Sequence, residues 1–268
     1  MTVTPLDLTA LRTRARLLSS PATPPPDFTW ARYRYEIRKD MLEQDIEDFT
    51  HWPTITCTMF VANAPYIDRE WKTIAPYPRY RKAAEEYPLG RPILFRDSRA
   101  SGNSIHQTYH LSQWEAWSGI KAEQLERVVE FGGGFGSMRA RFERLGYTGQ
   151  YNLYDTPEFS LLQEWYLSNL GIPAIYCPLE RDRFRPLDPG CDLLIACYSL
   201  SEVSPELRTA FFDSAAPQNV LIASQDGYGG EGLEVSWKQF TARRPNYHWE
   251  FQEITSLPGH FYLFGEKL

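Results

Sequence analysis

The stretch "VEFGGGFGSM", residues 129–138, places four glycines within five positions directly after a short apolar run. Glycines between a strand and a helix let the backbone approach a ligand closely and expose amide groups at the start of the helix. The dinucleotide fingerprint G-x-G-x-x-G requires a third glycine where this chain has Ser137, or Arg139 in the frame that begins at Gly134. The stretch therefore predicts a ligand-binding turn that departs from the pyrophosphate-binding pattern.

Short apolar runs alternate with amphipathic segments from about residue 126 onward. The predicted strands cover 126–131, 150–155, 173–178, 192–197, 219–224, 248–254 and 260–266, and the predicted helices 136–146, 157–171, 204–215 and 232–243. Alternating strands and helices indicate an α/β fold with a doubly wound, mostly parallel sheet. The tight turn between the last two strands requires the seventh strand to run antiparallel to its neighbour.

The first hundred residues have a different, helical and proline-rich character. We expect a helix from Thr4 or Pro5 to Leu18 with Thr4 as its N-cap, a proline-rich linker over 19–27, and a second helix over 28–49. Residues 50–100 give no clear pattern, and a further helix is expected over 110–120. The chain is therefore divided into an N-terminal helical region, 1–100, and a core, 101–268. The N-terminal region is expected to act as a lid, or to contact the acceptor or a second copy of this chain.

Composition and charge exclude several classes of protein. The 268 residues are 43% hydrophobic and 23% charged, as in a globular protein, and the net charge of −6 argues against nucleic-acid binding. No apolar run reaches 18 residues and no signal peptide is visible, so neither a membrane span nor secretion is expected. The four cysteines form no CxxC pair. These features predict a cytoplasmic protein with reduced thiols.

Two acids accompany the glycines. Glu130 lies two positions before Gly132, where it would repel a pyrophosphate and pair with a cationic amino group. Asp155, nineteen residues after Gly136, is expected at the end of the next strand, where an acid accepts hydrogen bonds from ribose hydroxyls. Together they predict a ligand that carries both a positive charge and a ribose.

The E-x-G-x-G-x-G run over 130–136 resembles the first motif of class I S-adenosylmethionine-dependent methyltransferases, whose Rossmann-like fold also ends in an antiparallel seventh strand. The segments "EFGGGFGSM", "YDTPEFSLLQEWYL", "CYSLSEVSPE" and "LPGHFYLFGEK" are similar, in order and wording, to the bacterial sugar O-methyltransferase family. This resemblance covers about residues 95–268. It implies S-adenosyl-L-methionine as cofactor and transfer of a methyl group to a hydroxyl of a small-molecule or glycan acceptor.

The resemblance and the strand ends together give a predicted cofactor site. Its residues follow the first, second, third and fourth predicted strands: Glu130, Gly132, Gly134, Gly136, Asp155, Thr156, Leu179, Tyr198 and Ser199. In an open α/β sheet, ligands bind beyond the carboxyl ends of the strands.

Glu202 and His110 are the predicted catalytic residues. Glu202 follows the fourth strand, where it could accept the proton of the acceptor hydroxyl, or merely favour a helix start as an acid. His110 and His106 would share a helix face, but no third ligand accompanies them and no metal is expected. Segment 101–110, with a Gly-Asn turn at 102–103, is expected to form a loop over the cofactor. The glycine-rich segment 224–232 is a second candidate for closure over the acceptor.

Three alternatives stay open. The acceptor could be a small aromatic or polyketide hydroxyl, which would change only the acceptor pocket. A nicotinamide-dependent oxidoreductase would have to bind its pyrophosphate beside Glu130. A non-catalytic scaffold of the same fold would have no use for both Glu130 and Asp155. The N-terminal helices could also join copies of this chain in a homo-oligomer.

Overall fold

A seven-stranded mixed sheet forms the centre of the protein, in a computed structural model that describes residues 3–19, 30–179, 189–225 and 233–268. The strand order is β3-β2-β1-β4-β5-β7-β6, with β7 antiparallel to β5 and β6. The strands are β1 (Arg127–Phe131), β2 (Gln150–Asp155), β3 (Ile175–Pro178), β4 (Leu193–Cys197), β5 (Asn219–Gln225), β6 (Tyr247–Glu253) and β7 (His260–Lys267). The predicted fold class and the antiparallel last strand are confirmed.

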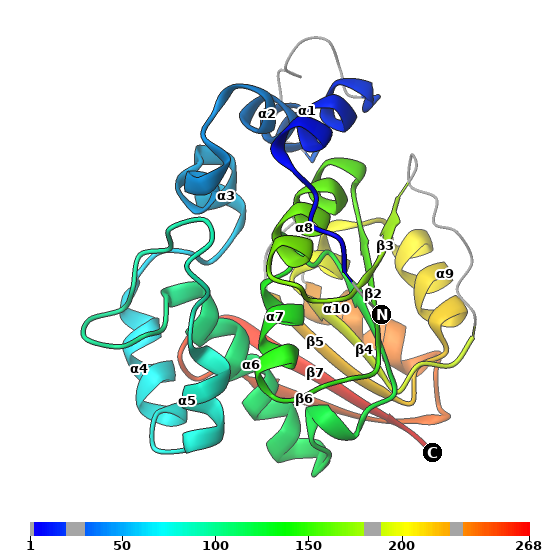
Figure 1. The fold of residues 1–268 in the computed structure, drawn as a ribbon. Coiled ribbons are helices and arrows are strands. Elements are labelled where there is room, and N and C mark those ends of the chain that lie inside the picture. The colour runs from blue at the N-terminus through cyan, green and yellow to red at the C-terminus, as the bar shows by residue number, and fades with distance from the viewer. Residues whose placement is uncertain (1–2, 20–29, 180–188, 226–232) are drawn as a thin grey trace.

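The central strands are apolar because both faces of the sheet are covered. Neighbouring residues of a strand point to opposite faces, so Val128 and Val129 join different apolar clusters, as do Leu193 and Leu194. One cluster includes Phe142 of α7 (Ser137–Arg144), Leu162 of α8 (Pro157–Asn169) and Trp114 of α6 (Gly102–Ser118). The other includes residues of α9 (Pro205–Ala215) and α10 (Leu233–Ala242). Figure 1 shows the sheet between these two layers of helices.

The N-terminal helices pack on the α7–α8 side and extend its apolar cluster. They are α1 (Leu8–Leu17), α2 (Trp30–Glu43), α3 (Pro53–Thr58), α4 (Pro65–Ile74) and α5 (Pro78–Ala84), with a short 3-10 turn, η1 (Ile46–His51), between α2 and α3. A second 3-10 turn, η2 (Ala122–Gln124), lies between α6 and β1. In Figure 1, α1 and α2 lie over α8, and α4 and α5 lie beside α6. Each of α3, α4 and α5 begins with a proline, which fits the first helical turn because it lacks the N–H that would be unpaired there. The region 1–100 therefore shares one core with the sheet.

Several predicted helix boundaries are confirmed. Helix α9 has Ser204 as its N-cap, accepting from the Leu207 N–H at 3.2 Å, with Pro205 in the first turn. Helix α6 ends at Gly119, whose φ of 73° is the left-handed conformation that glycine adopts without strain.

Other boundaries are wrong. Asp7 rather than Thr4 caps α1, because its carboxylate accepts from the Ala10 N–H at 2.8 Å. The helix predicted over 28–49 ends at Glu43. The expected loop at 101–110 belongs to one continuous helix with 110–118, capped by Ser101. Residues 20–27 of the predicted linker and 226–232 of the glycine-rich segment lie outside the described residues.

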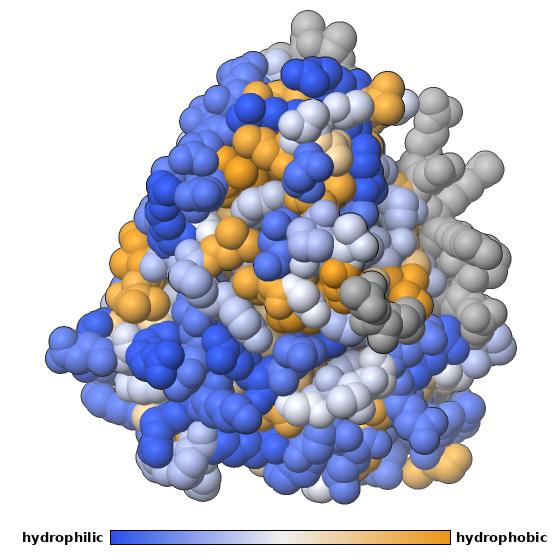
Figure 2. Space-filling view, in the orientation of Figure 1, coloured by the Kyte–Doolittle hydropathy of each residue, from blue (hydrophilic) through white to orange (hydrophobic). Residues whose placement is uncertain are grey.

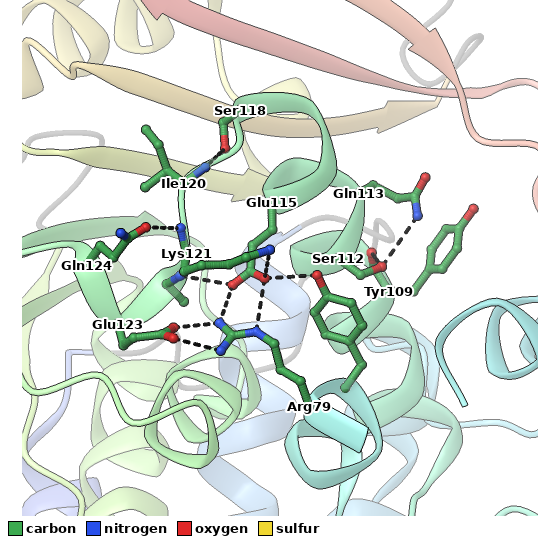
Figure 3. A network of polar contacts seen from close by, with 12 residues as sticks. Arg79, Tyr109, Ser112, Gln113, Glu115, Ser118, Ile120, Lys121, Glu123 and Gln124 are labelled. Carbon is green, nitrogen blue, oxygen red and sulfur yellow. Dashed lines mark hydrogen bonds and ion pairs between the residues drawn. The ribbon is translucent and has the colours of Figure 1, made fainter. Parts of the chain in front are cut away.

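A buried ion cluster joins α5 to α6 (Figure 3). Glu115 of α6, whose side chain is 0% exposed, pairs with Arg79 at 2.6 Å and accepts from the Tyr80 hydroxyl at 2.9 Å. Its carboxylate also accepts from the backbone N–H of Ala122 at 2.9 Å, and Arg79 also contacts Glu123. The cluster therefore ties the N-terminal helices to the segment that leads into β1.

The surface is mixed in character. Figure 2 shows hydrophilic residues over much of the lower part of one face and apolar residues gathered in its middle. Among the helices of the described ranges, none combines the length and the apolar character that a membrane crossing requires. No disulfide bond joins the four cysteines, all of which lie in described segments.

Candidate functional site

A cavity of about 620 Å³ lies beyond the carboxyl ends of β1, β2 and β4. The strand order reverses between β1 and β4, and such switch points are where open α/β sheets bind ligands. Its walls come from the glycine loop after β1, the 3-10 turn η3 (Ser199–Glu202), helices α2 and α6, and the segment Thr58, Met59 and Phe60. The N-terminal region thus completes a site whose floor is the sheet.

The glycine loop forms the wall next to β1. Gly132, Gly134 and Gly136 have φ angles of 72°, 59° and 95°, which L side chains rarely adopt. A Cβ atom on Gly132 would collide with Ser199, and one on Gly134 with Met59. Glycine is therefore required here both by backbone conformation and by close approach of the neighbouring walls.

Glu130 lies beneath this loop at the end of β1. Its carboxylate accepts from the Tyr151 hydroxyl at 2.8 Å, and the residue is 5% exposed. Burial raises the pKa of Glu130 to about 8, the Tyr151 hydrogen bond opposes the shift, and the nearby Asp155 adds to it. A buried acid with so high a pKa would be stabilised in its charged form by a cation in the cavity.

Asp155, at the end of β2, braces the loop from the other side. Its carboxylate accepts from the backbone N–H of Gly134 at 3.1 Å and of Thr156 at 2.7 Å, and from the Gln163 amide at 2.9 Å. Burial nevertheless raises its pKa to about 7. A carboxylate has about four acceptor positions, so Asp155 keeps capacity for a ligand hydroxyl.

Glu202, in η3, is the third acid that lines the cavity. Burial raises its pKa to about 7, and a hydrogen bond from the Trp30 side chain opposes that shift. A positive charge is supplied by Arg34, but its guanidinium is paired with Glu158 at 2.7 Å. Among the described residues that line the cavity, acids therefore outnumber bases, which disfavours an anionic ligand and favours a cationic one.

Some buried polar atoms in the described part of the cavity wall have no hydrogen-bond partner. Within the described part of the chain, these include Asn103 Oδ1, Ser137 Oγ and Thr156 Oγ1, and Asn103 and Ser137 are 3% and 4% exposed. An unpaired buried polar atom costs roughly 1–3 kcal/mol. A ligand that donates or accepts hydrogen bonds at these three places would recover part of that cost.

Nine predicted site residues line this cavity. They are the following: Glu130, Gly132, Gly134, Asp155, Thr156, Leu179, Tyr198, Ser199 and Glu202. Gly136 lies instead at the start of α7, where it is the N-cap residue. Sequence reasoning missed Trp30, Arg34, Met59, Phe60 and Gln107 as wall residues. Asn103 and Gln107, four apart on α6, could have been found had the segment 101–110 been read as a helix.

His110 lies outside the residues that line the cavity, in a buried chain of polar groups. His106 Nδ1 lies 2.9 Å from a Glu70 oxygen, the two Nε2 atoms of His106 and His110 are 3.1 Å apart, and His110 Nδ1 lies 2.7 Å from the Tyr262 hydroxyl. With the Glu70 carboxylate as acceptor, His106 carries its proton on Nδ1 and accepts from His110, which in turn accepts from Tyr262.

Burial lowers the pKa of His106 to about 3 and that of His110 well below its usual value, so both imidazoles are neutral near pH 7. Both nitrogens of His110 are already engaged, and its geometry does not favour the predicted role as base. In the described segments, no group of three His, Cys, Asp or Glu side chains is arranged to hold a metal ion.

No protein-family model matches this chain, and a search of curated proteins found no match. Solved structures with a similar arrangement include a SAM-dependent methyltransferase from Aquifex aeolicus, 13% identical with a TM-score of 0.45 over 59% of this chain and 92% of that one. The methyltransferase domain of bacterial CtHen1-C is 12% identical, with a TM-score of 0.44 over 60% of this chain and 98% of that one. The glycopeptide N-methyltransferase MtfA, complexed with sinefungin, is 10% identical, with a TM-score of 0.45 over 59% and 92%.

Proposed function

We propose that this protein is an S-adenosyl-L-methionine-dependent O-methyltransferase whose acceptor is a hydroxyl of a sugar or sugar-containing molecule. The observation that carries the proposal is the set of three carboxyl groups around one cavity behind a glycine loop: Glu130 and Asp155, which are buried, and Glu202, which is partly buried. S-adenosylmethionine carries an ammonium, a sulfonium and a ribose. Its positive charges complement this wall, and its ribose hydroxyls suit an acid at the end of β2.

The residues present fit this cofactor. Glu130 would face its positive part from beneath the glycine loop, and Asp155 would accept from the ribose hydroxyls. Asn103, Ser137 and Thr156 each offer a buried polar atom without a partner among the described residues, which suits the cofactor's polar groups. When bound, S-adenosylmethionine supplies an activated methyl group on a positively charged sulfur.

The protein's part in the chemistry is to orient the acceptor and to accept its proton. We assign the second task to Glu202, because it lines the cavity beside the end of β4 and its pKa of about 7 matches neutral conditions. The remaining walls, which include Trp30, Phe60 and Leu179, reduce the access of water. The choice of a sugar hydroxyl rests on the sequence resemblance over residues 95–268, and a cytoplasmic location is part of the same proposal.

The alternatives are less well supported by the cavity. A nicotinamide dinucleotide would bring its pyrophosphate against three acids, while Arg34 is already paired with Glu158. A silent scaffold would retain buried acids that destabilise the fold without use. An O-methyltransferase with a small aromatic acceptor would use the same cofactor site. Only an assay of methyl transfer to different acceptors separates it from the proposal.

The test is ligand-dependent stability. We expect S-adenosylmethionine and S-adenosylhomocysteine to raise the melting temperature, which corresponds to about 2.7 kcal/mol at a hundredfold excess over the dissociation constant. Titrations with NAD and NADH serve as controls. A shift with the dinucleotides and none with either adenosyl compound would overturn the proposal.

A further inference from the structure

Tyr198 has an unusual backbone at the edge of the cavity. It follows β4 directly, and its φ of 73° puts a bulky residue in the left-handed region, where side chains other than glycine are rare. Such a conformation costs about 1–3 kcal/mol and persists only where the surroundings enforce it. The turn η3, with Ser199 bonded to the Phe131 carbonyl, holds it.

The ring of Tyr198 is enclosed by aromatic groups on several sides. Its centroid lies 4.9 Å from that of Phe60 and 6.3 Å from that of His106, whose ring is nearly parallel to it. His110 lies 6.1 Å away, on the same buried chain that ends at Glu70 and Tyr262. The phenol is therefore fixed in place by the Phe60 ring and by two imidazoles, His106 and His110, that are themselves held by hydrogen bonds. Tyr198 still lines the cavity and is partly exposed.

His260 lies next to the hydroxyl group of Tyr198. It begins β7 and pairs with Gln225 at the end of β5, so it lies at the same edge of the sheet as the cavity. His260 Nδ1 lies 3.3 Å from the Tyr198 hydroxyl oxygen. Burial lowers the pKa of His260, so the imidazole is neutral near pH 7 and can carry its proton on Nδ1.

We propose that Tyr198 is a further catalytic residue, whose hydroxyl donates a hydrogen bond to the acceptor oxygen and orients it toward the transferred methyl group. This inference rests on the proposed function. His260 Nδ1–H donates to the Tyr198 oxygen, which leaves the phenolic proton free to point at the acceptor. As the acceptor oxygen bonds to the methyl carbon, the carbon–sulfur bond breaks and its electron pair stays on sulfur. The acceptor proton passes to the Glu202 carboxylate.

The test compares Tyr198→Phe with Tyr262→Phe. Each change removes a phenol oxygen that is hydrogen-bonded to a histidine: Tyr198 to His260 at 3.3 Å, and Tyr262 to His110 at 2.7 Å. Of these two tyrosines, Tyr198 lines the cavity and Tyr262 does not. Calorimetry gives the affinity for S-adenosylhomocysteine. NMR titration of that complex with methyl α-glucopyranoside and with UDP-glucose gives the affinity for a sugar hydroxyl.

We expect both variants to bind S-adenosylhomocysteine within threefold of the wild type. Tyr198→Phe should weaken binding of the sugar probe at least tenfold and slow methyl transfer to it at least tenfold, whereas Tyr262→Phe should change either by less than threefold. Nitrogen-15 NMR should find the Nδ1–H tautomer at His260. A wild-type protein that does not bind S-adenosylhomocysteine would refute the proposed function itself.

Three results would overturn the role of Tyr198 while that function stands. One is wild-type sugar affinity in Tyr198→Phe. Another is the Nε2–H tautomer at His260, because Nδ1 would then accept the phenolic proton of Tyr198 instead of donating to its oxygen. The third is a wild-type complex with S-adenosylhomocysteine that binds neither sugar probe.

Discussion

Glu202 and His110 differ in what surrounds them. Glu202 lies in the wall of the cavity with Trp30 as its partner, and a partly buried acid with a pKa near 7 can take up a proton under neutral conditions. His110 has both ring nitrogens engaged by His106 and Tyr262, and burial lowers its pKa far below 7. The carboxyl group is therefore the better candidate for the base.

The change Glu202→Gln keeps the shape of the side chain and removes its basicity. A positioned base contributes typically a hundred- to ten-thousandfold in rate, so we expect turnover to fall at least about a hundredfold with nearly unchanged cofactor affinity. His110→Asn should slow turnover less and mainly lower the melting temperature, because it disrupts the buried chain. Methyl transfer to an accepted sugar, measured for both variants, decides between them. An inactive His110→Asn beside an active Glu202→Gln would reverse the assignment.

The site residues that could be predicted from sequence are those fixed by strand ends. Glu130 and Asp155 follow from a glycine loop and the end of the next strand, a local pattern. The state of His110 depends on Tyr262, which is 152 residues away in the chain, and that of His106 on Glu70, which is 36 residues away. Contacts of this kind arise only from tertiary packing, so the hydrogen-bond partners of His110 could not be predicted from the sequence.

At the scale of elements, the docking of α5 on α6 depends on Glu115. Its buried carboxylate receives hydrogen bonds from Arg79, Tyr80 and the Ala122 N–H (Figure 3). Removal of the Glu115 carboxylate would deprive the Tyr80 hydroxyl and the Ala122 N–H of this acceptor and leave Arg79 with Glu123 as its ion-pair partner. The cluster should therefore contribute more to stability than the surface ion pairs elsewhere.

We expect Glu115→Ala to lower the free energy of unfolding by about 3 kcal/mol, measured by urea denaturation. The matched control is Arg91→Ala. Arg91 also contacts several carboxylates, those of Asp45, Glu47 and Asp48, but its side chain is 55% exposed, and solvent-exposed ion pairs contribute little to stability. Equal losses in the two variants would show that burial is not what makes the Glu115 cluster stabilising.

The elements of residues 50–100 were harder to predict than those of the sheet. Helices α3 and α5 have six and seven residues, too few for a helical period to appear. The signal that was present is the proline at each helix start, as in Pro53, Pro65 and Pro78. The strands could be predicted because continuous apolar runs such as "LLIAC", residues 193–197, are typical of a sheet covered on both faces.

On the scale of the whole molecule, the mostly parallel sheet and the antiparallel seventh strand could be predicted, whereas the path of the N-terminal region could not. This region completes the cavity through Trp30 of α2 and through Met59 and Phe60, which follow α3, and its helix α4 supplies Glu70 to the buried chain. The division at residue 100/101 and an oligomer through these helices stay predictions. One consequence concerns the whole fold: it buries titratable groups of opposite kinds, so its stability depends on pH.

Burial raises the pKa of Glu70 and Asp155 to about 7 and of Glu130 to about 8, and lowers that of His106 to about 3. An acid whose pKa is higher in the folded state stabilises the fold when it is protonated. For Glu130 this stability is complete below the unfolded pKa, near 4.5, and is lost as the pH rises through the folded pKa of about 8. For a histidine whose pKa is lower in the folded state, the stability is present above about pH 6.5 and is lost as the pH falls. The two groups therefore act in opposite directions between about pH 4.5 and 6.5.

Glu130→Gln isolates one of these contributions, because glutamine resembles the protonated acid at every pH and all other buried groups stay the same. Without cofactor, we expect the variant to match the wild type at pH 5 and to exceed its free energy of unfolding by about 1–3 kcal/mol at pH 8.5, by urea denaturation at both pH values. The exposed Glu206→Gln should leave the pH dependence of the wild type unchanged. The same Glu130→Gln protein should bind S-adenosylhomocysteine more weakly, since the charge that destabilises the empty fold is the one the ligand's ammonium needs. A variant less stable than the wild type at pH 8.5 would mean that the ionised carboxylate is already compensated without a ligand, and the electrostatic case for a cationic cofactor would fail with it.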